Sequence, residues 1–101
     1  MRQIWKYELK PGKNDFNFRN GSEIISVAVQ YNKPVLYVSV NTDEMEMVPV
    51  MIRCRMTGEP FEPEKGERYI GTMIMDNEML GSFVLHAFFV PQGEKDEEKT
   101  E

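Results

Sequence analysis

Residues 24–40 read IISVAVQYNKPVLYVSV, and this stretch decides the fold class. In its first half Ile25, Val27, Val29 and Tyr31 alternate with smaller or more polar side chains such as Ser26 and Gln30. Alternation with a period of two is typical of a β-strand that buries one face. Residues 32–34, Asn-Lys-Pro, separate the two apolar runs and are short enough to close a hairpin. We therefore predict an antiparallel hairpin over residues 24–40.

The second half of this stretch differs from the first, because residues 35–38, Val-Leu-Tyr-Val, are apolar on both sides of the chain. A strand whose side chains are apolar on both sides is typical of a central strand that is covered on both faces. We therefore expect residues 35–40 to lie inside a sheet rather than at its edge.

Short apolar runs separated by turn residues recur along the rest of the chain. Together with the hairpin they predict seven strands, within residues 5–9, 16–19, 24–31, 35–40, 45–57, 69–75 and 83–90. The last two runs form a second predicted hairpin, over residues 69–90. This pattern predicts an all-β protein, a small antiparallel sandwich or barrel, with no helix. We expect one domain, residues 1–92, followed by a disordered acidic tail, residues 93–101.

The run at residues 45–57 is the longest, and its alternation assigns its side chains to two faces. Val48, Val50, Ile52, Cys54 and Met56 share one face, whereas Met45, Met47, Met51, Arg53 and Arg55 share the other. Pro49 interrupts the run and lacks a backbone N–H. We expect an edge, a bulge or a bend at this proline.

Composition limits the function classes that remain. The chain has 101 residues and a net charge of −5; residues 1–40 carry a net charge of +3 and residues 41–101 a net charge of −8. Binding to a phosphate backbone requires clustered Lys and Arg, so we expect no nucleic-acid partner. The N-terminus lacks the apolar run of a signal peptide, and no apolar run is long enough to span a bilayer. We therefore expect a cytoplasmic protein with no membrane partner.

Five short motifs follow one another along the chain: IWKYEL at residues 4–9, SVAVQ at 26–30, TGEP at 57–60, RYIGT at 68–72 and LHAF at 85–88. Their order resembles that of a family of short, uncharacterised phage and bacterial proteins, a domain of unknown function. The resemblance covers roughly residues 4–90 and leaves the acidic tail outside it. It implies a compact β fold and a phage or mobile-element origin, and it transfers no catalytic residue.

Arg53 and Arg55 form the best candidate for a ligand site in the sequence. Two arginines on one face of a strand can hold a carboxylate or a phosphate by paired hydrogen bonds. Arg68 joins them if the segment before it folds back. The aromatic side chains available to stack on a base are Trp5, Tyr37 and Tyr69. The alternative is that the arginines pair with glutamates of this chain.

The methionines suggest a different kind of surface. Seven of the eight fall between Met45 and Met79, and Met45 and Met47 alternate with Glu44 and Glu46. Methionine recurs at surfaces that adapt to a partner, so Met45, Met47 and Met51 are our candidate interaction surface. The alternative is that these side chains fill the core.

His86 is the sole histidine and Cys54 the sole cysteine, and neither carries a recognisable catalytic pattern. Catalysis by histidine needs a nucleophile or an orienting carboxylate nearby, which one strand does not provide. Alternation places Arg53 and Arg55 on the face opposite Cys54, so we expect Cys54 to be a core residue. We predict no catalytic residue, no metal site and no cofactor.

These observations predict a non-enzymatic accessory protein of a phage or mobile element that acts through protein–protein contact. A host factor is one expected partner and a second copy of the chain is another. Two alternatives stay open: a protein that binds or sequesters a small molecule such as a nucleotide signal, and a minor structural component of a virion.

Overall fold

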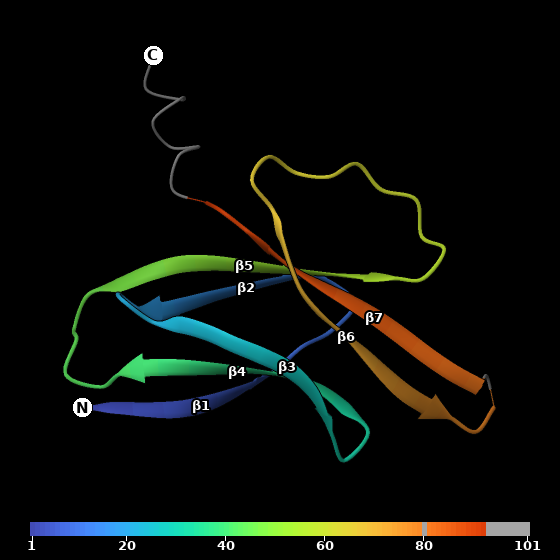
Figure 1. The fold of residues 1–101 in the computed structure, drawn as a ribbon, viewed down its shortest axis with the longest axis horizontal. Helices are drawn as coiled ribbons and strands as arrows, with labels where there is room; N and C mark the ends of the chain where they lie inside the picture. The colour runs from blue at the N-terminus through green and yellow to red at the C-terminus, as the bar shows by residue number, and fades with distance from the viewer. Residues whose placement is uncertain (80, 93–101) are drawn as a thin grey trace.

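The computed structural model describes residues 1–79 and 81–92, which form seven β-strands and no helix (Figure 1). The strands are β1 (Arg2–Glu8), β2 (Gly12–Arg19), β3 (Glu23–Gln30), β4 (Lys33–Asn41), β5 (Met47–Met56), β6 (Arg68–Asn77) and β7 (Gly81–Val90). All strand pairs are antiparallel. The predicted all-β class is therefore confirmed, whereas the predicted disorder of residues 93–101 lies outside the described residues. No helix in the described part of the chain is long and apolar enough to cross a membrane.

The strands are divided between two sheets. The three-stranded sheet has the order β1-β4-β3, and the four-stranded sheet has the order β2-β5-β7-β6. Each sheet has two edges, so the fold is a sandwich rather than a closed barrel. Both predicted hairpins are present, as the pairs β3–β4 and β6–β7. The turn between β3 and β4 differs from the predicted residues 32–34, because Lys33 and Pro34 belong to β4 and the turn consists of Tyr31 and Asn32. Both turn residues have a positive φ, as the two central residues of a type I′ turn require.

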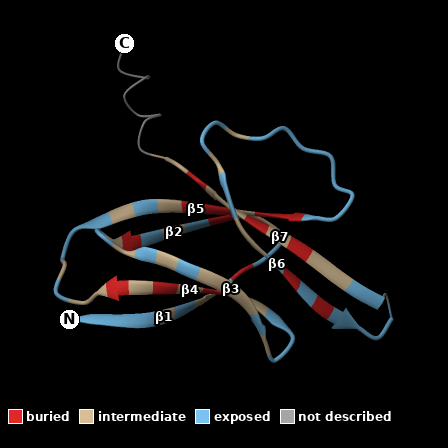
Figure 2. Cartoon of the chain, viewed as in Figure 1, coloured by how far each residue is buried: buried red, intermediate tan, exposed pale blue. Residues whose placement is uncertain are grey.

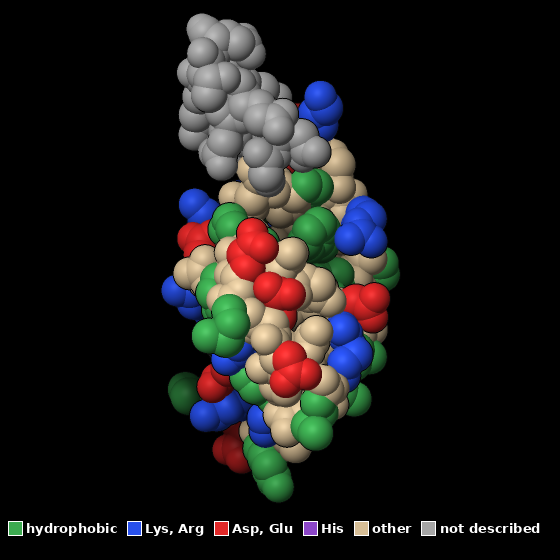
Figure 3. All heavy atoms as spheres, turned by 90° about the vertical axis from the view of Figure 1, so that its left-hand side faces the viewer, with side chains coloured by type: hydrophobic (Ala, Val, Ile, Leu, Met, Phe, Trp, Pro, Cys, Tyr) green, Lys and Arg blue, Asp and Glu red, His purple; other side chains and the backbone are tan. Residues whose placement is uncertain are grey.

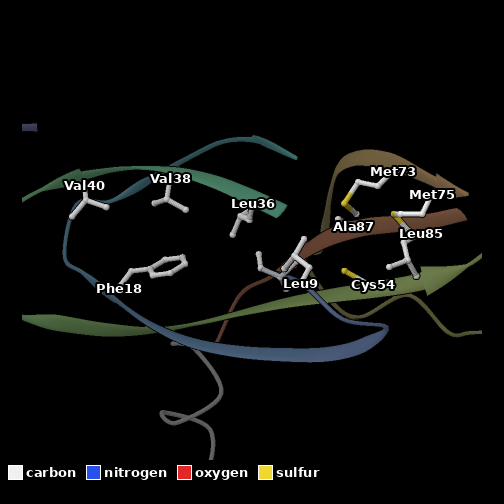
Figure 4. Packing of buried hydrophobic residues seen from close by; sticks show 11 residues of the cluster. Leu9, Phe18, Leu36, Val38, Val40, Cys54, Met73, Met75, Leu85 and Ala87 are labelled. Carbon is white, nitrogen blue, oxygen red and sulfur yellow. The ribbon is translucent and has the colours of Figure 1, made fainter. Parts of the chain in front are cut away.

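The core lies between the two sheets (Figures 2 and 4). The three-stranded sheet contributes alternate residues of β4, namely Leu36, Val38 and Val40, which are at most 1% exposed. From the four-stranded sheet the deepest side chains are Ile52, Cys54, Met73, Leu85 and Ala87. Burying a leucine or isoleucine side chain of this kind stabilises a fold by roughly 1.5–3 kcal/mol, which makes this layer the main source of stability.

The structure confirms part of what the sequence predicted for β4 and β5. β4 is the central strand of its sheet, but only its inner face is covered by the second sheet. Val35 points to the outer face, where Glu8 and Ala28 flank it in register, and it is nevertheless buried. Pro49 lies where β5 is paired with β2 alone, because pairing with β7 begins at Met51. Pro49 therefore occupies a local edge, as expected.

One prediction for β3 is wrong, because the strand contains a bulge at Ile25. Ile24 pairs with Val38 and Val27 pairs with Leu36, so Ile24 and Val27 both face the core although they are three residues apart. Ile25 is the extra residue of the bulge and is 49% exposed. It therefore does not share a face with Val27 and Val29, although the alternation predicts that it does. A bulge leaves one residue unpaired and bends the strand, and this bend shapes the site.

β6 has a bulge of its own at Ile70, and the two bulged strands touch just beyond their bulges. An ideal Cβ placed on Gly71 would lie 2.7 Å from Cγ2 of Val27, so the two sheets approach here as closely as a glycine permits. Farther along, the Asn32 side chain donates to the carbonyl of Asp76 and accepts from its N–H. The second halves of β3 and β6 are therefore held together.

Candidate functional site

A groove of about 820 Å³ opens between the sheets at the end where the first halves of β3 and β6 lie. One wall is formed by residues 20–25, which include the β2–β3 turn and the start of β3. The facing wall is formed by residues 68–70 at the start of β6. The groove is thus bounded by the two bulges, and bulges are over-represented beside functional sites.

The floor of the groove is apolar. The side chains that form it come from five strands and are Phe18, Ile24, Val48, Val50, Ile70 and Phe89. Phe18 is buried, and the other five are only partly buried. A concave, mainly apolar pocket of several hundred cubic ångströms with a few polar groups at its edge is typical of a small-molecule site.

Among the residues that the structure describes, two charged side chains line the groove, and they point to different sides of their sheets. Glu23 pairs in register with Ser39 on the outer face of its sheet, and its carboxylate lies 3.9 Å from the Arg2 guanidinium. Arg68 pairs in register with Phe89, and its guanidinium carbon lies 4.9 Å from the centre of the Phe89 ring. No carboxylate in the described part of the chain is within ion-pair distance of Arg68. Arg68 is therefore the charged group available to the groove.

The predicted arginine pair is engaged elsewhere. Residues 57–67, which we call the strap, link β5 to β6 (Figure 1). Arg53 donates to Glu64 at 2.8 Å, and Arg55 donates two hydrogen bonds to Glu67 at 3.0 and 3.1 Å. These partners lie within the strap, so the expected alternative, pairing with glutamates of the same chain, is what the structure contains.

Arg55 and Glu67 form a buried ion pair, with side chains 4% and 9% exposed. The rings of Phe61 and Phe88 also contact the Arg55 guanidinium, with its central carbon 3.8 and 4.8 Å from the two ring centres. Burial raises the pKa of the Glu67 carboxyl, but the hydrogen bonds and the charge of Arg55 outweigh this effect and the pKa is lowered overall. The pair fixes the strap to the outer face of the four-stranded sheet.

The structure does not bring the six predicted ligand residues together. Arg68 and Tyr69 both line the groove, although the Tyr69 ring packs against Phe88 on the outer face. Trp5 packs against the core, whereas Tyr37 pairs in register with Lys6 and Ser26 on the outer face of the three-stranded sheet. These two aromatic residues lie on a different sheet from Arg53 and Arg55, so a base stacked on them would be remote from both arginines.

His86 takes part in a chain of hydroxyl groups on the outer face. Its Nε2 lies 2.7 Å from the Thr57 hydroxyl and its Nδ1 lies 3.0 Å from the Thr72 hydroxyl, which in turn is bonded to the Tyr69 hydroxyl. Within residues 1–79 and 81–92 no carboxylate bonds to either ring nitrogen, so the arrangement that would orient a catalytic histidine is missing there.

Cys54 is 1% exposed and packs in the core. Desolvation by burial raises the pKa of its thiol to about 11, so the thiol stays protonated at neutral pH. A protonated thiol is a poor nucleophile and a poor metal ligand. Among the described residues no group of three or more His, Cys, Asp or Glu side chains is placed to hold a metal ion.

The predicted methionine surface is divided by the fold. Met45 is 82% exposed and Met47 is 50% exposed, whereas Met51 is 4% exposed and so does not belong to an accessible surface of the monomer. Met51 pairs in register with Val90, which is fully buried. Figure 3 shows the end of the molecule that carries the β4–β5 connection, where acidic and hydrophobic side chains lie side by side. The exposed methionine patch therefore consists of Met45 and Met47.

The sequence reasoning missed most of the groove. The alternation patterns predict only strand positions, with no role in a site, for Ile24, Val50 and Phe89. A signal was present, since Ile24-Ile25 and Tyr69-Ile70 are pairs of adjacent large apolar residues that interrupt the alternation of their strands. Such pairs mark both bulges, and both bulges border the groove.

Comparison with protein families matches residues 1–98 to a domain of unknown function. The expected resemblance to an uncharacterised family is therefore confirmed, and it extends beyond the predicted limits of about 4–90. Comparisons with curated proteins and with solved structures gave no significant match. Any assignment of function to this chain therefore rests on the geometry of the molecule.

Proposed function

The chain belongs to DUF7352, a family of domains of unknown function, and from its geometry we propose that it is a non-enzymatic binding protein whose groove takes a small, largely apolar ligand. The groove of about 820 Å³ between the sheets carries this proposal. Its volume lies within the range of roughly 300–1,000 Å³ that small-molecule pockets occupy. We expect the protein to act in the cytoplasm, and the phage or mobile-element origin stays a prediction.

The partial exposure of the floor supports this function. Side chains that pack against the core but stay accessible from one side leave apolar surface in contact with water. A ligand that covers this surface removes it from water, which is worth about 25 cal/mol for each Å² covered. The Val27–Gly71 contact and the Asn32–Asp76 hydrogen bonds hold the far halves of β3 and β6, so the groove is formed before a ligand arrives. A preformed site lowers the free-energy cost of binding.

The test is titration of the native protein with the neutral fluorescent dye N-phenylnaphthylamine, which becomes brighter in an apolar site. We expect saturable binding of one dye per chain. The substitution Val48→Phe, which enlarges a floor side chain, is expected to weaken dye binding by about tenfold or more. The matched control Val29→Phe makes the same change on β3, outside the groove, and should bind the dye as the unmodified protein does. Equal binding by the two variants, or no saturable binding at all, would reject the groove as a ligand site.

A second candidate function, contact with a protein partner, is favoured by the exposure of Met45 and Met47. Both are flexible apolar side chains, and Glu44 and Glu46 lie beside them in the sequence. An apolar patch with an acidic border suits a partner that presents apolar side chains with basic neighbours. A second copy of this acidic patch is a poorer match, because like charges would face each other.

For this candidate we expect a partner to co-purify from host cells with the unmodified chain and to be lost in the variant Met45→Ser/Met47→Ser. The matched control is Met79→Ser, because Met79 is 91% exposed but lies in the β6–β7 connection. Native mass spectrometry of the same samples distinguishes another polypeptide from a second copy of the chain. A partner that is retained by the double variant, or lost equally in the Met79 control, would contradict this role of the patch.

A further inference from the structure

We infer that the ligand of the groove is an amphipathic anion, whose apolar body lies on the floor and whose carboxylate is bound by Arg68; this inference rests on the proposed function. Of the described residues that line the groove, Glu23 and Arg68 are charged. The strand register places the two side chains on different faces of their sheets. The Glu23 side chain lies on the outer face of the three-stranded sheet, beside Arg2.

Arg68, by contrast, lies on the inner side of β6. Its register partner is Phe89, a floor residue that packs against the core, and the guanidinium is stacked over that ring. Stacking on an aromatic face holds the planar guanidinium while leaving its N–H donors free to point outward. A cation held in this way at the edge of an apolar surface is suited to a ligand with one anionic end and one apolar end.

Two other arginines on the same sheet differ from Arg68 in having carboxylate partners, and this difference supports the assignment. Arg53 and Arg55 each have a carboxylate partner at about 3 Å, from Glu64 and Glu67. In the part of the chain that the structure describes, no carboxylate lies within ion-pair distance of Arg68. An arginine fork binds a carboxylate by two parallel hydrogen bonds, which are stronger than hydrogen bonds between neutral groups. The ligand would therefore supply the carboxylate that the chain supplies to the other two arginines.

The test is displacement of N-phenylnaphthylamine by decanoate and by decanol, which have the same apolar chain and differ in charge. We expect decanoate to displace the dye at a concentration about tenfold lower than decanol does at low salt. Added salt should reduce this preference, since Arg68 is exposed and its charge is screened. The substitution Arg68→Gln should abolish the preference, so that decanoate and decanol displace the dye at similar concentrations, and Arg68→Lys should retain part of it.

Lys13→Gln provides the matched control for net charge, because Lys13 lies on the outer face of β2, in register with Arg53 and away from the groove. This variant should keep the preference for decanoate. Equal displacement by decanoate and decanol would overturn the inference but leave the proposed function standing, since both would still bind. A parallel loss of decanol and decanoate binding in Arg68→Gln would also overturn it. Failure of the dye to bind the unmodified protein would instead reject the proposed function itself.

Discussion

Replacement of Glu67 by alanine is expected to lower the free energy of unfolding by about 3–5 kcal/mol. The Glu67 carboxylate accepts two hydrogen bonds from Arg55, and both side chains are almost fully buried. Without this carboxylate the Arg55 guanidinium stays enclosed between Phe61 and Phe88 with no negative charge opposite it. An unpaired buried charge is costly because water does not reach it. Urea denaturation of the variant and the unmodified protein measures the effect.

The control for this prediction is Glu62→Ala in the same strap, because Glu62 is exposed. It should change stability by no more than about 0.5 kcal/mol. The double variant Arg55→Met/Glu67→Leu should recover most of the lost stability, since it removes both charges and keeps an apolar contact with the two rings. Equal effects of Glu62→Ala and Glu67→Ala would show that the buried pair does not anchor the strap.

The same pair predicts how stability depends on pH. The pKa of Glu67 is lowered in the folded protein, so its ionised form stabilises the fold above the pKa of an unfolded glutamate, about 4.3. This contribution is lost as the pH falls through the lowered folded pKa. We therefore expect the stability difference between the unmodified protein and Glu67→Gln to be largest near neutral pH and to shrink below about pH 4. A difference that stays constant over this range would contradict the lowered pKa.

The substitution Gly71→Val is expected to destabilise the protein by about 3 kcal/mol. A Cβ atom at this position would lie 2.7 Å from Cγ2 of Val27, and the two further methyl groups of valine would increase the overlap. The φ angle of Gly71 is not positive, so the backbone itself accepts a side chain and the cost is one of packing between the sheets. Urea denaturation is again the measurement.

The partner substitution tests whether this contact is the cause. Val27→Ala alone should destabilise the protein, because it removes methyl groups from the inter-sheet contact. In the double variant Val27→Ala/Gly71→Ala the two effects should partly cancel, since the space that one change opens receives the methyl group of the other. If the losses of stability simply add, Gly71 is required for a reason other than its contact with Val27.

Much of the fold could be predicted from the sequence, because the relevant interactions are local. The period-two patterns identified all seven strands, and both hairpins followed from short turns between apolar runs. For β5 the alternation also identified the buried face, with Ile52 and Cys54 in the core and Arg53 and Arg55 opposite. Side-chain direction along a strand is determined by the pleat of that strand alone, so these predictions needed no knowledge of its neighbours.

What only the tertiary structure decided is which strands are neighbours and where they diverge. The orders β1-β4-β3 and β2-β5-β7-β6 bring Arg53 and Arg55 under the strap and leave Trp5 and Tyr37 on the other sheet. A bulge is an insertion relative to a partner strand, so the bulges at Ile25 and Ile70 exist only once that partner is in place. Residues of both bulges line the groove, and just beyond them Val27 and Gly71 bring the two sheets close together. The sequence by itself therefore determined the strands and, away from the bulges, their faces, whereas the site depends on pairing between residues that are distant along the chain.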